Sequence, residues 1–336
     1  MQGVTRQMRM QRWRLLTLLL LLIGLFFISL FLGRYPRNGI LTWTTLLQDD
    51  LAQRLVFNLR LPRLLTALLL GMSLSAGGMV FQMLFANPLV EPGFLGVSQG
   101  AAFGAAFSIV LLGGGAAIVQ LSAAFFALAG LGFSYLLAHR IRYGGWVLRL
   151  VFAGIAISAL YSAGLGILKY LADPLSQLPE ITFWLLGGLS SITWQDFLSI
   201  LPAAALGLIA LFLLRWRLNV LSLNETVAFS VGTSPRRERL LLLAAAVLPI
   251  AAVTSVAGMV GWIGLIMPHI ARRLFGTDTR FNLPASMLMG GIFAIICDDI
   301  ARTLLAGEIP LGILTSLLGA GVFILLMIFR GVRIER

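Results

Sequence analysis

The chain has few charged side chains and one cysteine for its length. Of its 336 residues, 11% are Asp, Glu, Lys or Arg, whereas a soluble protein carries about a quarter. A soluble core cannot absorb 59% hydrophobic residues, so we expect lipid to surround most of the chain. Cys297 is the single cysteine, which excludes an intrachain disulfide and leaves the redox compartment open.

Lysine is almost absent as well, and this excludes one kind of nucleotide site. A phosphate-binding P-loop requires Gly-x-x-x-x-Gly-Lys-Ser/Thr, and the only lysine, Lys169, follows Leu168 and precedes Tyr170. His139 and His269 have no cysteine or carboxylate at metal-ligand spacing, and no nucleophile lies beside a base. We therefore expect no catalytic residue, no metal site and no cofactor bound by this chain.

Long apolar runs make up most of the sequence. A helix needs roughly 20 apolar residues to span a bilayer, and backbone groups in lipid must pair within their own segment. We predict an all-α, polytopic membrane protein with one domain over residues 1–336. About ten transmembrane helices are expected, at 15–33, 62–84, 93–112, 115–138, 146–171, 197–215, 239–259, a short one near 264–276, 283–304 and 311–330. The intervening stretch 172–180, ADPLSQLPE, has the composition of a turn.

The net charge of +12 comes mainly from arginine. No basic face interleaved with aromatic residues lies outside the expected spans, so nucleic acid is excluded as a partner. Most of the arginines fall on one set of loops. Because such loops remain in the cytoplasm, we expect both termini to be cytoplasmic.

A few charged residues depart from this pattern. Arg60 and Arg63, in LRLPRLL, lie where a helix should begin on the opposite side, and both the loop bias and the helix dipole disfavour cations there. They either reach lipid headgroups or meet an anionic partner from outside. Asp298 lies one turn before Arg302, which predicts a structural ion pair. A proton or cation relay is the alternative for this carboxylate.

Small residues recur every four positions in GIAISALYSAGLG. Gly154, Ser158, Ser162 and Gly166 therefore share one helix face. Such a face permits close helix packing. Alternatively, it forms a smooth wall beside the path of a bulky solute.

Four segments together resemble one family. They are 59–104 (with ANPLVEPGFLGVSQGA), 218–232, 261–284 (with GLIMPHIARRLFG) and 298–326. The resemblance is to the FecCD-type permease subunits of iron-chelate and cobalamin ABC importers. It implies a BtuC-like type II importer fold that moves an iron-siderophore, haem or cobalamin-type chelate by alternating access. An ion-coupled secondary transporter is the alternative function.

The resemblance also implies partners and a location. A second permease subunit, in a homodimer, would complete the pathway in the bacterial inner membrane. Two ATPase subunits, which hold ATP and Mg²⁺, would dock on the cytoplasmic side, and a solute-binding protein would dock outside. By this resemblance Arg60, Arg63 and Arg302 would face acidic residues of the binding protein.

A cytoplasmic coupling loop is implied at about 218–238, where it would press against the ATPase. Its expected contact residues are Leu223, Asn224, Glu225, Ala228, Val231 and Gly232. This sequence has Asn224 where similar proteins have glycine, and Asn also tolerates a left-handed backbone. It also doubles the usual single aspartate, as Asp298–Asp299.

Overall fold

Helices form nearly all of the structure, a computed structural model that describes residues 2–35, 39–221, 230, 233–305 and 307–328. Two short strands, β1 (Leu32–Gly33) and β2 (Gly39–Ile40), pair antiparallel with Leu32 opposite Ile40. The helices are α1 (Gln2–Phe31), α2 (Trp43–Gln48), α3 (Asp50–Arg54), the π-helix η1 (Leu55–Arg60), α4 (Leu61–Leu84), α5 (Val97–Leu111), α6 (Ala116–Arg140), α7 (Trp146–Leu171), α8 (Gln177–Leu186), α9 (Trp194–Leu221), α11 (Pro235–Ala257), α12 (Ile263–Phe275), α13 (Thr279–Thr303) and α14 (Leu311–Ile328).

The ten predicted apolar runs all form helices. Within the described residues, 8 helices are long and apolar enough to cross a membrane. The other two of the ten are shorter, since α5 has 15 residues and α12 has 13. Helix α1 begins well before the predicted start at residue 15, because its arginine-rich N-terminal segment is also helical.

One helix lies partly in a segment that we interpreted as a turn. Helix α8 begins at Gln177, inside the predicted break at 172–180. Pro179 does not prevent this because it lies in the first helical turn, where backbone N–H groups have no partner within the helix. Asp173 accepts backbone hydrogen bonds from Leu175 and Ser176 just before α8. The polar residues therefore form a turn that leads into the helix.

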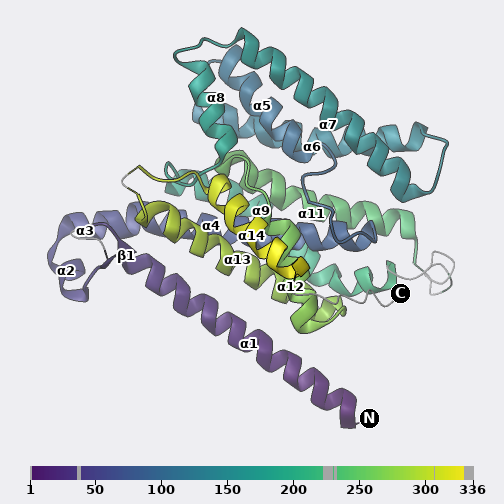
Figure 1. Ribbon diagram of the computed structural model, residues 1–336, viewed down its shortest axis with the longest axis horizontal. Coiled ribbons are helices and arrows are strands. Elements are labelled where there is room, and N and C mark those ends of the chain that lie inside the picture. Colours follow the sequence, from purple (N-terminus) through teal and green to yellow (C-terminus); the bar gives the residue numbers. More distant parts are fainter. Residues whose placement is uncertain (1, 36–38, 222–229, 231–232, 306, 329–336) are drawn as a thin grey trace.

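Helix α4 lies at the centre of the bundle. It packs against α13, α11, α12 and α9, and 78% of its most apolar window is buried. The corresponding windows of α1, α7 and α14 are only about a fifth buried, at 17%, 22% and 22%. Figure 1 shows α1 along one edge of the bundle and α7 along the opposite edge. The exposed apolar side chains of α1, α7 and α14 suit contact with lipid or with another membrane subunit.

Helices α4 and α13 approach each other through glycine. A Cβ atom added at Gly71 would lie 2.1 Å from the Gly290 carbonyl oxygen, and one at Gly290 would lie 2.2 Å from the Gly71 carbonyl oxygen. One turn away, Ser75 Oγ lies 2.7 Å from both the carbonyl oxygen and the Oγ of Ser286. Small residues let the two backbones approach closely, which fixes α13 against α4 along its length.

This contact predicts the effect of adding a methyl group. Gly290→Ala should lower the stability of the protein by about 1–3 kcal/mol, because the new atom overlaps the backbone of α4. Gly132→Ala in α6 is the matched control, since no atom lies within 4 Å of its added Cβ. SDS-induced unfolding in mixed micelles measures both variants. Equal stability of the two variants would contradict the close α4–α13 contact.

Candidate functional site

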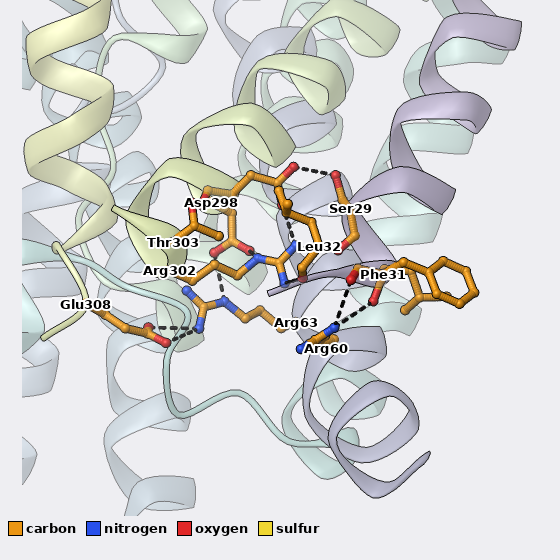
Figure 2. Close-up of polar contacts among 11 residues, drawn as sticks. Ser29, Phe31, Leu32, Arg60, Arg63, Asp298, Arg302, Thr303 and Glu308 are labelled. Atoms are coloured by element: carbon orange, nitrogen blue, oxygen red, sulfur yellow. Dashed lines mark hydrogen bonds and ion pairs between the residues drawn. The ribbon is translucent and has the colours of Figure 1, made fainter. Parts of the chain in front are cut away.

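Charged side chains from two helices and a connecting segment gather where α4 begins. We call this set the charge cluster: Arg63 from α4, Asp298, Asp299 and Arg302 from α13, Glu308 from the α13–α14 connection, and Ser29 from α1 (Figure 2). Arg63 Nε donates to Asp298 Oδ1 at 2.8 Å. Arg63 Nη1 lies 2.8 Å from both carboxylate oxygens of Glu308. Arg63 of α4 therefore binds both the buried part of α13, through Asp298, and the connection between α13 and α14, through Glu308.

Arg302 binds on the other side of the cluster. Its Nη2 donates to Asp299 Oδ1 and to the Ser29 carbonyl oxygen, and its Nη1 donates to the Leu32 carbonyl oxygen at 2.7 Å. The Ser29 hydroxyl donates to Asp299. These bonds tie the end of α13 to the end of α1.

The predicted Asp298–Arg302 pair is present but is not the main contact of Asp298. Arg302 Nε lies 3.7 Å from Asp298 Oδ2, which is too far for a hydrogen bond. The close partner of Asp298 is Arg63, which lies on a different helix. Spacing within one helix identified a true neighbour but could not reveal this tertiary one.

Arg60 lies beside the cluster and is only partly buried. Its Nη1 donates to the carbonyl oxygens of Leu30 and Phe31, both at 3.3 Å. A Cβ atom at Gly33 would lie 2.1 Å from Arg60 Nη2, so the glycine leaves room for the guanidinium. In the part of the chain that the structure describes, Arg60 has no carboxylate partner.

Arg63 therefore differs from the outward-facing cation that the sequence suggested. Arg63 and Arg302 are buried, with side chains only 10% and 7% exposed, and both have carboxylate partners within the chain. Asp298 is fully buried. A buried charge must be paired or it destabilises the fold strongly. The expectation of an unpaired surface cation is wrong for Arg63. The pairing of Arg302 with a carboxylate was expected from its spacing to Asp298, and the docking role of both arginines stays a prediction.

One side of the charge cluster opens into a cavity. The cavity has a volume of about 600 Å³ and is lined by Arg63, Glu308, Glu180 and Trp184, together with Gly187–Ser191, Val256–Gly258 and Ile309–Leu311. Sequence reasoning missed Glu308. The available signal was that it is the sole acidic residue between the last two predicted spans.

The small-residue face of α7 has two environments. Gly154 is buried against the segment before α5, where an added Cβ would lie 3.0 Å from Leu95 Cδ2. Ser158 lines a second cavity of about 390 Å³, which also contains Gln99 and Glu91. Ser162 and Gly166 are exposed. Close packing therefore explains the small residue at Gly154, whereas Ser162 and Gly166 contact no neighbouring helix of the described residues closely enough to be buried.

The predicted coupling residues Leu223, Asn224, Glu225, Ala228, Val231 and Gly232 lie outside the described residues. The helices before and after them are well anchored. Asn219 Nδ2 near the end of α9 donates to Asp278 Oδ1 at 2.8 Å, and Arg217 pairs with Glu238 in α11.

Asp278 is the N-cap of α13 and remains ionised at neutral pH. Hydrogen bonds from the Arg280 guanidinium lower the pKa of the Asp278 carboxyl below its usual value. Its bond to Asn219 therefore connects α9 to a charged cap, which fixes the end of α9 relative to α13.

Comparison with known proteins gives the family. The FecCD transport family matches residues 20–329. The chain belongs to this family. It is 41% identical over 273 residues to the Helicobacter pylori protein named "Probable iron chelatin transport system permease protein", covering 81% of this chain and 82% of that one. It is 37% identical over 317 residues to the Haemophilus influenzae molybdate import system permease protein MolB, covering 92% of each.

A solved structure has the same fold. It is a metal-chelate type ABC transporter in an inward-facing conformation, with a TM-score of 0.86 and 35% sequence identity. The match covers 94% of this chain and 99% of that chain. The polytopic, all-α permease fold expected from the sequence is confirmed.

The charge cluster predicts a large cost for neutralising its buried acid. Asp298→Asn should destabilise the protein by about 3–5 kcal/mol, because it leaves Arg63 without its close buried partner. The exposed Asp50→Asn is the control and should change stability by about 0.5 kcal/mol or less. Unfolding in SDS mixed micelles measures both. Similar small losses in the two variants would show that the buried pair is not a structural requirement.

Proposed function

We propose that this chain is the membrane permease subunit of an ABC importer that carries an iron chelate of the siderophore, haem or cobalamin type. The observation that supports this most directly is the family match over residues 20–329, together with the likeness to a metal-chelate type ABC transporter. The names of the two relatives refer to an iron chelate and to molybdate. We favour the chelate because the relative named for it is the more identical.

In this proposal the chain forms a pathway and breaks no bond in the solute. It has no P-loop lysine, so separate ATPase subunits would hold ATP and Mg²⁺, and this chain would bind no cofactor. Two copies of the chain would surround the pathway and open it alternately to the two sides. The cavity beside Ser158 and the open face at Ser162 and Gly166 support this region of α7 as part of that pathway.

The orientation in the bacterial inner membrane is also part of the proposal. Arg140, Arg142, Arg215 and Arg217 lie near the ends of α6 and α9, and such loops are retained in the cytoplasm. Figure 1 shows α1 beginning and α14 ending toward the same side, which supports cytoplasmic placement of both. The charge cluster then lies near the external surface.

Two partner surfaces complete the proposal. The loop with Leu223, Asn224 and Glu225 would contact the ATPase and transmit its closure as a rigid-body movement. At the opposite end, Arg60, Arg63 and Arg302 would receive acidic residues of the solute-binding protein. Complementary charge would set the register and the rate of this docking.

The test is transport by the reconstituted complex. Proteoliposomes with this chain, its ATPase and its solute-binding protein should accumulate one of a panel of radiolabelled compounds: ferric siderophores, haem, cobalamin and molybdate. Accumulation should require ATP inside the vesicle and all three components. Uphill uptake by the chain alone, driven by a proton or sodium gradient, would instead establish an ion-coupled secondary transporter.

A coupling variant is the control for the role of the ATPase. Glu225→Arg should abolish ATP-driven uptake and weaken retention of the ATPase in a detergent pull-down. Glu180→Arg, which introduces the same charge change in α8, should leave ATPase retention unchanged. Normal retention with Glu225→Arg would remove the coupling assignment.

A further inference from the structure

Within the charge cluster, the ion pair of Arg63 with Glu308 differs from the pair of Arg63 with Asp298. The Asp298 side chain is 0% exposed and belongs to α13. The Glu308 side chain is 38% exposed and belongs to the connection between α13 and α14. Glu308 is therefore the partner that can leave Arg63 more readily. Water already reaches its carboxylate, and its departure requires no movement of α13.

The geometry of this pair is also incomplete. Both carboxylate oxygens of Glu308 lie 2.8 Å from one nitrogen, Nη1, of Arg63. Within the described residues, Nη2 donates no hydrogen bond. The strongest arginine–carboxylate arrangement uses two nitrogens, each donating to its own oxygen. A carboxylate that approaches without the constraint of a short connecting segment can take Nη1 and Nη2 together.

The cavity supplies the route for such a carboxylate. Arg63 and Glu308 both line the 600 Å³ cavity, and Figure 2 shows Glu308 on the far side of the Arg63 guanidinium from Arg60. Asp298 holds Nε from the buried side. An incoming carboxylate therefore meets the guanidinium at the position that Glu308 occupies.

We propose that Glu308 is an internal counter-ion of Arg63, and that a carboxylate of the partner replaces it on the guanidinium when the partner docks. This inference rests on the proposed function, in which the partner is an acidic surface of the solute-binding protein. Docking exchanges one carboxylate for another on Arg63, so the buried guanidinium stays paired throughout. The exchange explains how an arginine that is already paired in this chain can also be a docking residue. Leaving a buried charge unpaired would be far costlier than the exchange.

The exchange acts on a segment that continues directly into α14. Glu308 is followed by Ile309 and Pro310, and the backbone N–H of Gly312 points to the Gly187 carbonyl oxygen at 3.5 Å. A Cβ atom at Gly312 would lie 2.3 Å from the Leu186 carbonyl oxygen and 2.7 Å from that of Met259. The start of α14 thus packs directly on the end of α8 and on the segment after α11. Release of Glu308 removes the side-chain bond that holds this segment to α4, while the Ile309 N–H remains bonded to the Ala301 carbonyl oxygen at 3.2 Å.

Glu180 provides a matched control. It lines the same cavity and carries the same charge, but its carboxylate forms no ion pair among residues 2–35, 39–221, 230, 233–305 and 307–328. Glu308→Gln and Glu180→Gln each remove one negative charge from the cavity. Only the first removes a competitor from Arg63.

The experiment measures the affinity of the complex for its cognate solute-binding protein. The permease–ATPase complex is held in nanodiscs, and the solute-binding protein without solute is titrated by biolayer interferometry. Glu308→Gln should bind about two- to fivefold more tightly than the unmodified complex, the range expected when a partly exposed competing ion pair is removed. Glu180→Gln should change the affinity by less than about twofold.

A spin label on the connecting segment gives a second readout. With Gly307→Cys labelled, addition of the solute-binding protein should sharpen the spectrum as Glu308 is released. The Gly307→Cys/Glu308→Gln protein should show the sharp spectrum before any addition. Cys297 is buried and does not compete for the label.

The outcomes separate this inference from the function on which it rests. No binding of the solute-binding protein to the unmodified complex overturns the proposed function, and the exchange with it. Binding to the unmodified complex with equal or weaker binding to Glu308→Gln overturns the exchange alone. Equal tightening by Glu180→Gln also overturns it, since the effect would then be general charge. An unchanged label spectrum on docking contradicts release of the segment.

Discussion

Asp298 is a fully buried carboxylate near the end of a membrane-spanning helix, and the structure around it follows from that charge. A carboxylate in this position must be paired, and its close partner is Arg63 at 2.8 Å. That contact requires the beginning of α4 to lie beside the end of α13. Glycine and serine along the two helices then let their backbones approach closely over the remaining length. Arg302, Asp299 and Ser29 extend the same set of contacts to α1.

Apolar and charged side chains lie in different parts of the protein. Helices α1, α7 and α14 expose apolar side chains that suit lipid or a second membrane subunit. The ion pairs among the described residues lie at the two ends of the bundle. At one end lies the charge cluster, and at the other lie Asn219, Asp278 and the Arg217–Glu238 pair. This division suits a permease that water-soluble partners move from outside and inside.

The helices could be predicted well because lipid imposes a simple rule. Long apolar runs must be helical, and the ten expected helices all occur. Helix α8 was missed because Asp173, Pro174 and Pro179 have the composition of a turn, and only the hydrogen bonds of Asp173 reveal that the turn leads into a helix. The start of α1 was placed too late because arginine favours a helix as well as a loop.

The charge cluster was predicted only in part. Arg60 and Arg63 were identified as unusual, and the Asp298–Arg302 spacing was visible within one helix. The bonds of Arg63 to Asp298 and Glu308 join residues 235 and 245 positions apart, and no local pattern encodes such contacts. Arg63 was therefore interpreted as a cation that needs an outside partner, whereas its carboxylate partners lie within the chain.

A double-mutant cycle tests the central role of the Asp298–Arg63 pair most directly. Arg63→Gln, Asp298→Asn and the double variant are compared with the unmodified protein by unfolding in SDS mixed micelles. If the loss in each single variant comes mainly from removing the close partner of the other buried charge, the double variant will be more stable than Asp298→Asn alone. Losses that simply add in the double variant would show that the two side chains act independently, and would contradict the account.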